Sequence, residues 1–418
     1  MAAVARSLED WLRWQETLHP KVIALGLERV REVALRLGVA QGPAVTLTVG
    51  GTNGKGSSAT LAADIYEAAG YPTGLYTSPH LLHYRERIRI DGVPADDASL
   101  CRAFAAVEAA RGEVALTYFE FGTLAALWLF REAGVQVQVL EVGLGGRLDA
   151  VNLVDADAAL LTNVGLDHQD WLGPDRESIG REKAGIFRAG RPAVIAEREP
   201  PQSVQRALDA LGAHPWRLGR DYDYVADAQG GWTWSSRTTT WSRLPAPGLA
   251  GAIQIHNAAG VLAAVAALQE RRPVTEEAVR RALPRLRLPG RCERIGSVLL
   301  DVAHNLESAE VLAEALAAQQ APPVQLVLGM LADKPVAEVA RRLAPRVAQA
   351  WLVGLPGPRG LSAGELSQRI DGCGFAAECC DNMRQAMDRA RMAAGPAGLV
   401  LVTGSFLTVA EARQSIDG

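Results

Sequence analysis

The sequence predicts an α/β fold of two domains, a larger one built on a parallel sheet and a smaller open one after it. Three observations support this prediction. The chain has 418 residues, which is too long for one ordinary hydrophobic core. Segments typical of strands and helices alternate along most of it, as they do in parallel sheets covered on both faces. A break rich in proline and arginine, at residues 284–291, separates two runs of this alternation.

The elements of the larger domain come first. Segment 8–37 has apolar residues at helical spacing and is divided by Pro20. Strands are expected at 45–49, 137–142, 158–163 and 193–196, with helices between them. Segment 231–243 carries three tryptophans among threonines and serines, which predicts a small antiparallel excursion whose tryptophans serve packing.

The second run of alternation follows the break. Pro284 and Pro289 end the preceding helix, so we expect domains at 1–287 and 288–418. Strands are expected at 298–302, 324–329, 350–353, near 376 and at 399–402. Helices are expected from 306 and from 336, at 363–370 and 383–393, and at the end of the chain.

Composition and charge exclude several classes of protein. With 48% hydrophobic and 22% charged residues the chain is typical of a soluble folded protein, and its net charge of −4 offers no basic field for nucleic acid. The longest apolar run, 258–268, is shorter than the roughly 20 residues of a membrane span. Charges from Arg6 onward argue against a signal peptide. We expect a cytoplasmic monomer with five reduced thiols, at Cys101, Cys292, Cys373, Cys379 and Cys380.

A glycine-rich loop lies between the first expected strand and an alanine-rich helix. It reads Gly51-Thr52-Asn53-Gly54-Lys55-Gly56-Ser57. Its amides and the helix N-terminus can surround a phosphate, with Lys55 reaching the β- and γ-phosphates and Ser57 or Ser58 touching a metal ion. It departs from the standard P-loop because Gly56 separates the lysine from the serine. An ordinary glycine turn is the alternative, but the lysine and the flanking elements favour phosphate binding.

Two further side chains follow buried strands. Glu141 lies at the end of the run 137–142, and His168 follows 158–163. Ligands of open α/β sheets bind at the edge where parallel strands end, so Glu141 predicts a Mg²⁺ site beside the phosphate loop. The alternatives are a solvated strand end for Glu141 and a purely structural role for His168.

Seven motifs in order resemble the bacterial bifunctional dihydrofolate synthase/folylpolyglutamate synthases, the folate branch of the Mur ligase superfamily. Besides the loop they are Tyr-Thr-Ser-Pro-His-Leu at 76–81, Glu-Val-Gly-Leu-Gly-Gly-Arg-Leu-Asp-Ala at 141–150, Leu-Asp-His-Gln-Asp-Trp-Leu-Gly at 166–173, Arg-Glu-Lys-Ala-Gly-Ile-Phe at 181–187, Leu-Pro-Gly-Arg at 288–291 and Asp-Val-Ala-His-Asn at 301–305. They span nearly the whole chain. The resemblance implies a Mur-ligase-like P-loop domain with a parallel sheet, followed by a smaller Rossmann-like C-terminal domain.

The resemblance also implies an ATP-dependent amide ligase. Such an enzyme joins L-glutamate to dihydropteroate, giving dihydrofolate, and to the γ-carboxylate of reduced folates, through an acyl phosphate with ATP and two Mg²⁺ sites. A monofunctional folylpolyglutamate synthase is the nearest alternative. A cell-wall Mur ligase is disfavoured because no UDP-binding domain precedes the loop. A nucleotide-binding protein without catalysis is disfavoured because it would need none of Glu141, His168 and Lys183.

Site residues follow from the matched motifs. The resemblance implies catalytic roles for Lys55, Glu141, His168 and Lys183, with Lys183 carbamylated to N6-carboxylysine; an unmodified Lys183 could neutralise phosphate, and a surface lysine is the alternative. The implied metal ligands are Ser57, Ser78, Glu141 and His168. The implied ATP contacts are Thr52, Asn53, Gly54, Lys55, Gly56, Ser57, Asn257, Arg291, Asp301 and His304.

The pterin contacts and three remaining positions complete the set. The implied pterin contacts are Ala24, Leu25, Gly26, Leu27, Thr117, Tyr118, Phe119, Glu120, Leu148, Asp149 and Ala150. An aromatic residue such as Phe119 suits stacking on a flat heterocycle, although a core role is its alternative. Asn257 could also cap the apolar helix that follows it. Lys334 and Ser405 are expected at strand ends of the second domain, without an assigned role.

Overall fold

The chain folds into two compact units. A computed structural model describes residues 6–21, 23–227, 230–318 and 323–417. One unit comprises Met1–Pro247 and Ile255–Leu286, and the other comprises Gly248–Gln254 and Arg287–Gly418. Within the described ranges no helix has the length and apolar character needed to cross a membrane. All five cysteines are free thiols, as predicted.

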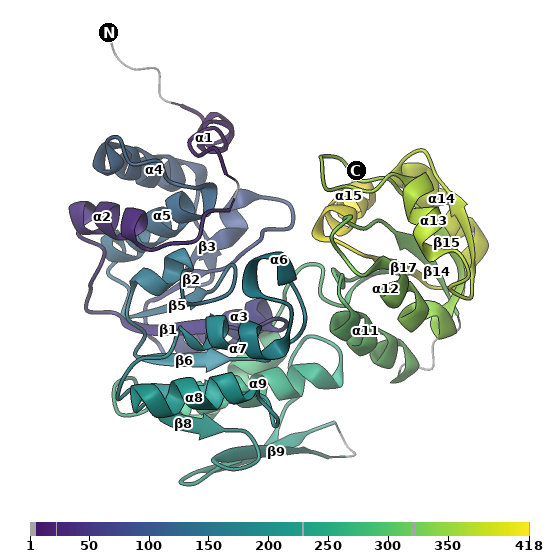
Figure 1. Cartoon of the computed structure of the whole chain (residues 1–418). Helices are drawn as coiled ribbons and strands as arrows, with labels where there is room; N and C mark the ends of the chain where they lie inside the picture. The colour runs from purple at the N-terminus through teal and green to yellow at the C-terminus, as the bar shows by residue number, and fades with distance from the viewer. Residues whose placement is uncertain (1–5, 22, 228–229, 319–322, 418) are drawn as a thin grey trace. The chain divides into compact units, whose positions relative to one another are not determined.

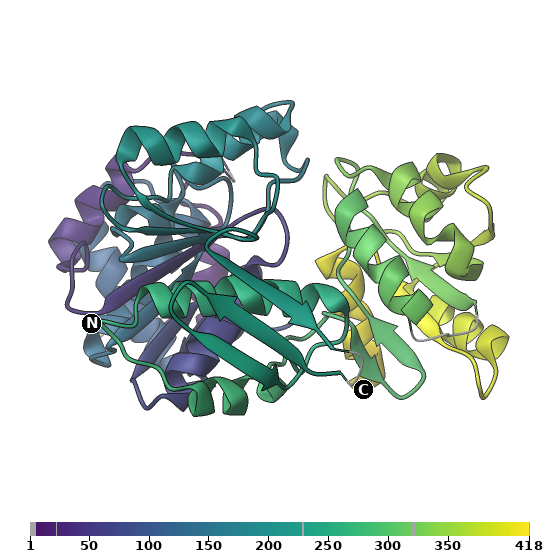
Figure 2. The same ribbon diagram turned by 90° about the horizontal axis from the view of Figure 1, so that it is seen from below.

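The first unit is built on an eight-stranded sheet of order β4-β3-β2-β5-β1-β6-β7-β8. Its parallel strands are β2 (Thr73–Tyr76), β5 (Val137–Glu141), β1 (Val45–Gly50), β6 (Ala158–Leu161), β7 (Pro192–Ile195) and β8 (His214–Arg217). The antiparallel strands β3 (Ile88–Ile90) and β4 (Val93–Pro94) form one edge. Figure 2 shows helices on both faces of this sheet. The predicted parallel sheet with covered faces is confirmed.

Ten α-helices, three short 3-10 helices and a small sheet complete the described part of this unit (Figure 1). The helices are α1 (Leu8–Gln15), α2 (Glu28–Leu37), α3 (Lys55–Ala68), α4 (Asp97–Arg111), α5 (Tyr118–Glu132), α6 (Gln169–Leu172), α7 (Arg176–Ala184), α8 (Gln202–Leu211), α9 (Ala252–Ala267) and α10 (Glu276–Ala282). Strands β9 (Tyr222–Ala226), β10 (Trp232–Ser236) and β11 (Thr240–Leu244) form the antiparallel sheet expected around the tryptophans. Trp232 and Trp234 are fully buried, which confirms their packing role.

Two boundaries differ from the prediction, and β8 is among the strands that were not predicted. Helix α9 begins at Ala252, so Asn257 lies inside it and the prediction that Asn257 caps this helix is wrong. The break in segment 8–37 is wider than Pro20 alone, because α1 ends at Gln15 and α2 begins at Glu28; residue 22 of this segment lies outside the described residues. Strand β8 carries no alternating apolar pattern, so the sequence does not reveal it.

The second unit contains a six-stranded sheet of order β12-β13-β17-β14-β15-β16. Its strands are β12 (Glu293–Ile295), β13 (Val298–Leu300), β17 (Val400–Thr403), β14 (Val324–Leu328), β15 (Val347–Leu352) and β16 (Ala376–Cys379), all parallel except β12. Its helices are α11 (Leu306–Ala318), α12 (Val336–Leu343), α13 (Ala363–Ile370), α14 (Met383–Ala394) and α15 (Phe406–Asp417). Leu326, Leu328 and Val339 belong to its buried core. The predicted smaller α/β domain is confirmed.

The register of the first sheet determines where functional side chains emerge. Val49 pairs with both Glu141 and Leu160, and Tyr76 pairs with Leu140. The carboxyl ends of β2, β5, β1 and β6 are therefore level with one another. Segments that leave these strands meet at a single edge of the sheet, which is the usual position of a ligand site in an open α/β fold.

Candidate functional site

The phosphate loop lies between β1 and α3, as predicted. Gly54 precedes α3 with a left-handed backbone (φ 78°), which favours glycine. Lys55 Nζ donates to the carbonyl of Thr52 at 3.1 Å. The buried Ser57 hydroxyl donates to the carbonyl of Gly54 at 3.2 Å and accepts from Asn257 Nδ2 at 3.4 Å. The loop is thus braced by its own side chains and by a residue from α9.

A neighbouring strand end also holds the phosphate loop. Asn163 Oδ1 accepts from the amides of Thr52 and Asn53, at 3.2 and 2.8 Å. The Thr52 hydroxyl accepts from the amide of Gly165 at 2.9 Å, and Thr162 Oγ1 donates to the carbonyl of Asn53 at 2.7 Å. The amides of Thr52 and Asn53 are therefore bonded to Asn163, and these bonds shape the loop. Motif matching does not reveal Asn163, because the contact spans two strands.

Glu141 and Ser78 are brought together at the sheet edge. Glu141 is the last residue of β5, and its carboxylate is buried with 4% of the residue exposed. Its Oε2 accepts from the amide of Ser78, which follows β2, at 2.8 Å. The alternative of a solvated strand end is wrong. A buried carboxylate next to a phosphate loop suits a cation that neutralises nucleotide phosphates.

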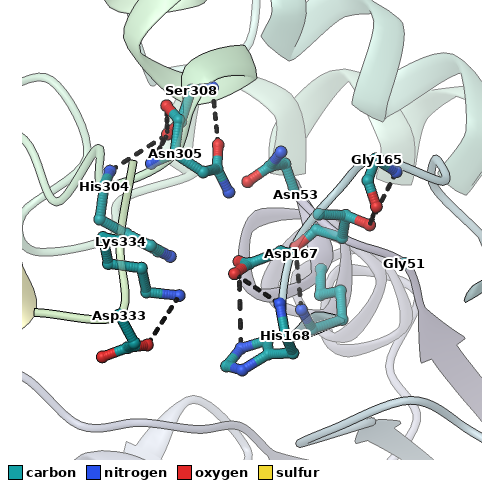
Figure 3. A network of polar contacts seen from close by, with 12 residues as sticks. Gly51, Asn53, Gly165, Asp167, His168, His304, Asn305, Ser308, Asp333 and Lys334 are labelled. Atoms are coloured by element: carbon teal, nitrogen blue, oxygen red, sulfur yellow. Dashed lines mark hydrogen bonds and ion pairs between the residues drawn. The ribbon is translucent and has the colours of Figure 1, made fainter. Parts of the chain in front are cut away.

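His168 lies on the segment that leaves β6. Its backbone is left-handed (φ 52°), its amide donates to Asp167 Oδ1 at 2.8 Å, and its Nε2 lies 3.9 Å from Asp167 Oδ2 (Figure 3). Its side chain is 38% exposed, so it is accessible to a ligand. Within the ranges that the structure describes, no three His, Cys, Asp or Glu side chains are grouped to hold a metal ion. A metal bound by Glu141 and His168 would therefore need hydroxyl, phosphate or water oxygens as further ligands.

Lys183 is buried, with 4% of the residue exposed, so the alternative of a surface lysine is wrong. It lies near the end of α7, whose cap is Gly185. Its Nζ donates to the carbonyl of Gly51 in the phosphate loop at 2.8 Å. A Cβ on Gly146 would lie 2.9 Å from the carbonyl oxygen of Lys183, so the glycine-rich segment after β5 passes directly against this helix end. The structure therefore places Lys183 at the phosphate loop.

Of the three segments assigned to the pterin, 24–27 bonds directly to 148–150 and is joined to 117–120 through Arg29. The amide of Gly26 donates to the carbonyl of Leu148 at 3.3 Å. Thr117 and Glu120 form a capping box at the start of α5, in which Glu120 Oε2 accepts from the amide of Thr117 at 2.7 Å. The other oxygen of Glu120 accepts from Arg29 Nη2 at 2.9 Å. The motifs did not indicate Arg29. Within the same segments Leu27 and Ala150 are buried, whereas Ala24, Leu25 and Tyr118 are partly buried.

Phe119 and Asp149 have distinct surroundings within these segments. A Cβ on Gly143 would lie 2.7 Å from the Phe119 ring, so the ring rests directly on that glycine, and its centroid lies 5.8 Å from that of Tyr76. Asp149 is buried, and its carboxylate accepts from the amides of Leu144 (2.8 Å) and Val151 (3.1 Å). Burial raises the pKa of Asp149 to about 7. This carboxyl group can therefore either donate or accept a hydrogen bond near neutral pH.

In the second unit, polar residues follow β13. Asp301 accepts from the amides of Cys292 and Ala303, both at 2.9 Å. His304 Nδ1 lies 2.9 Å from the carbonyl of Val302, so it carries a proton and leaves Nε2 as an acceptor in the neutral ring. Asn305 Oδ1 accepts from the amide of Ser308 at the start of α11, as Figure 3 shows.

The other residues of interest in this unit also lie near strand ends. The Arg291 guanidinium carbon lies 5.2 Å from the centroid of the Phe406 ring. Lys334 is buried, with Nζ 3.9 Å from Asp333 Oδ2 (Figure 3). The buried Ser405 hydroxyl lies 2.8 Å from Thr408 Oγ1. Asp301, Lys334 and Ser405 follow β13, β14 and β17, which are adjacent in the sheet.

The chain matches two family models, described as "Mur ligase middle domain" over residues 49–267 and "Mur ligase, glutamate ligase domain" over residues 290–406. It is 44% identical over 419 residues to the Dihydrofolate synthase/folylpolyglutamate synthase of Escherichia coli (strain K12), covering 99% of this chain and 96% of that protein. The structure of E. coli FolC in complex with DHPP and ADP matches with a TM-score of 0.93 at 44% identity, covering 99% and 98% of the two chains. A bifunctional folylpolyglutamate synthase/dihydrofolate synthase from Yersinia pestis, complexed with AMPPNP and Mn ion, matches with a TM-score of 0.91 at 42% identity, covering 100% of both.

Proposed function

The chain belongs to the Mur ligase family, and we propose that the side chains at the carboxyl edge of its first sheet carry out the chemistry of the folate branch. The protein is an ATP-dependent amide ligase, a dihydrofolate synthase/folylpolyglutamate synthase. It joins L-glutamate to dihydropteroate and to the γ-carboxylate of reduced folates, using ATP and a divalent metal ion. The observation that carries the proposed site is the hydrogen bond between Ser78 and the buried Glu141, at the strand ends that flank the phosphate loop.

The reaction explains why cations and buried carboxylates are needed together. A carboxylate is a poor acyl donor until ATP phosphorylates it, and charge on the transferring phosphoryl group must then be neutralised. A divalent metal ion supplies that neutralisation when bound. Glu141, Ser78, His168 and Ser57 would hold it, and this oxygen-rich donor set with one imidazole fits Mg²⁺. Exclusion of water protects the acyl phosphate until the glutamate amine attacks.

We assign the nucleotide phosphates to the phosphate loop. Lys55 provides a cation at the start of α3, where the helix N-terminus also favours an anion. Gly54, Gly56 and Ser57 complete the cradle, and Thr52 and Asn53 supply its shape through Asn163. Asn257 supports the loop from α9 through Ser57.

We further propose that Lys183 is carbamylated. Its amine reaches the phosphate loop through Gly51. A carbamate keeps one N–H on Nζ, so the bond to Gly51 is compatible with the modification, which adds a carboxylate that can orient a metal or water. Mass spectrometry of the native protein in bicarbonate should show an added mass of about 44 Da that is lost on acidification; a single unmodified mass under both conditions would contradict the assignment.

The pterin contacts are assigned to the three segments around Phe119 and Asp149. The half-buried Phe119 ring can stack on the heterocycle. Asp149, with a pKa raised to about 7 by burial, can hydrogen-bond its polar edge. Leu25 and Leu27, with Tyr118 and Ala150, supply apolar surface beside them. In the second unit we assign Asp301, His304 and Arg291 to the nucleotide and take residues 288–418 as the ligase domain.

The experiment that tests the function is ADP release by the purified chain with Mg-ATP and L-glutamate. Turnover is expected with dihydropteroate and with tetrahydrofolate. Turnover with tetrahydrofolate alone would identify a monofunctional folylpolyglutamate synthase. Glu141→Gln keeps the size of the side chain but removes the charge, so we expect it to lower kcat by about a hundredfold or more. A protein that only binds nucleotide would lose at most some affinity for ATP.

The oligomeric state, the compartment and the absence of nucleic-acid binding are also proposals. We infer a monomer that acts in the cytoplasm and binds no nucleic acid. The five free thiols support the cytoplasm, and the net charge of −4 argues against nucleic acid. Light scattering during size exclusion gives the oligomeric state directly, and a mass near twice 44.5 kDa would contradict it.

A further inference from the structure

Arg29 lies in an unusual place for an arginine. It is the second residue of α2, where the positive end of the helix dipole disfavours a cation. Its Nη2 donates to two acceptors outside the helix, the carbonyl of Ala24 and Glu120 Oε1, each at 2.9 Å. Glu120 lies 91 positions further along the chain, and its side chain is only 4% exposed. The guanidinium therefore joins the loop before α2 to a buried carboxylate at the start of α5.

The partners of Arg29 connect the segments around the proposed pterin site. Glu120 Oε2 accepts from the amide of Thr117, so the same carboxylate also fixes the first turn of α5, which carries Phe119. The loop of Ala24 is held a second time where the amide of Gly26 donates to the carbonyl of Leu148, the neighbour of Asp149. Among these contacts, Arg29 is the charged side chain that bonds both to the loop and to α5.

We propose that Arg29 is a positioning residue for the pterin-type acceptor, holding the loop Ala24–Leu27 against the start of α5. The inference rests on the proposed function, because it assumes that these segments receive the acceptor. Without the guanidinium, Glu120 keeps only its bond to Thr117, and the carbonyl of Ala24 loses its donor. The loop then samples more positions, so the acceptor must order it on binding. The phosphate loop makes no part of these contacts, so ATP binding is unaffected.

Substitutions at both partners separate charge from helix capping. Arg29→Ala removes the guanidinium, and Arg29→Lys keeps a cation with fewer donors. Glu120→Gln preserves the capping box, in which glutamine serves as well as glutamate, and removes the charge that pairs with Arg29. Arg280→Ala is the matched control: Arg280 also joins a glutamate (Glu276, 2.7 Å) to backbone carbonyls of a distant segment, at Ser242 and Arg243, away from the site.

The test is steady-state ADP release by the full chain, with KM measured separately for dihydropteroate and ATP, and thermal unfolding measured for each variant. For Arg29→Ala we expect the KM for dihydropteroate to rise about tenfold, with the KM for ATP within about twofold of the unaltered chain. Arg29→Lys should recover part of this loss, and Glu120→Gln should raise the same KM about threefold. The double variant Arg29→Ala/Glu120→Gln should raise the KM for dihydropteroate by less than the product of the two single increases, because the residues act as a pair.

Three results would overturn the inference. In the first, Arg29→Ala raises the KM for dihydropteroate and the KM for ATP together. In the second, Arg29→Ala leaves the KM for dihydropteroate unchanged. The third is an Arg280→Ala variant that raises the KM for dihydropteroate as much as Arg29→Ala does, which would make the effect one of stability. If Arg29→Ala fails to fold, Arg29→Lys and Glu120→Gln decide the question through the same two KM values. Failure of the proposed function is distinguishable, because the unaltered chain would then release no ADP with dihydropteroate.

Discussion

The phosphate loop and the N-terminal loop Ala24–Leu27 flank the same sheet edge but are held in different ways. The phosphate loop is fixed by many short contacts with the segment after β6, through Thr162, Asn163 and Gly165. Among the described residues, the N-terminal loop is hydrogen-bonded to other segments by a single guanidinium and one backbone amide, and it buries Leu27 in the core. A motif identifies the first loop because its own glycines, lysine and serine form the recognisable pattern. The second loop is joined to α5 by Arg29, which lies outside any motif, so this contact is visible only in the structure.

The largest effect should come from Gly51, where the phosphate loop touches its neighbour most closely. Gly51 has φ 147°, and a Cβ there would lie 1.8 Å from Thr162 Oγ1 and 3.2 Å from the amide of Asn163. Gly51→Ala must displace the loop from β6, so we expect ADP release to fall by about a hundredfold or more. Gly42→Ala is the control, because a Cβ at Gly42 meets nothing within 4 Å. Equal activity of the two variants would show that the loop tolerates a different shape.

A smaller effect is expected at Asn163, which holds the loop through one side-chain oxygen. Asn163→Ala leaves the amides of Thr52 and Asn53 without this acceptor, so we expect the KM for ATP to rise about tenfold with the KM for dihydropteroate unchanged. This is the reverse of the pattern expected at Arg29. Gln138→Ala is the control, because Gln138 Nε2 donates to Thr46 Oγ1 at 2.8 Å between β5 and β1, away from the loop. The comparison between the loops fails if both variants change the KM for ATP alike.

Features that depend on residues close together in the sequence were predicted, whereas contacts between residues far apart in the sequence were not. Strand-to-helix alternation predicted both sheets, and the motifs placed Glu141 and Lys183 correctly at strand and helix ends. The start of α9 was wrong because its apolar pattern becomes strong only after Asn257. Arg29 and Asn163 were missed for another reason. Their partners lie 91 and 110 or more positions away, and no local pattern records such pairings.

The burial of Lys183 and Glu141 is a second feature that the sequence does not reveal. In the sequence both look like exposed charges. Both follow apolar or helical runs whose ends usually meet solvent. In the structure each is 4% exposed, because the glycine-rich segment after β5 and the end of α7 pack closely together. A buried charge needs partners, and here they include the amide of Ser78 for Glu141 and the carbonyl of Gly51 for Lys183. The protein's own backbone thus orients both of these charged groups.

The smallest expected effect concerns pH and distinguishes the pterin side of the site from the phosphate loop. Burial raises the pKa of Asp149 to about 7 from its ordinary value of 3.8. A raised pKa in the folded state means that this carboxyl stabilises the fold fully below pH 3.8 and that the contribution is lost as pH rises through 7. The free energy of unfolding should therefore fall by about 1 kcal/mol between about pH 6 and about pH 8 on account of this group.

Comparison of Asp149→Asn with the unaltered chain isolates that contribution. Burial also raises the pKa of Asp64 to about 6 and of Glu67 to about 7, so these groups add to the slope in the same direction. The amide side chain of this variant offers one acceptor oxygen fewer to the amides of Leu144 and Val151, which lowers stability at every pH. The informative quantity is therefore the slope of the unfolding free energy with pH, measured by urea denaturation. A slope in Asp149→Asn as steep as that of the unaltered chain would mean that Asp149 is ionised in the folded protein, and that it can only accept hydrogen bonds from the pterin.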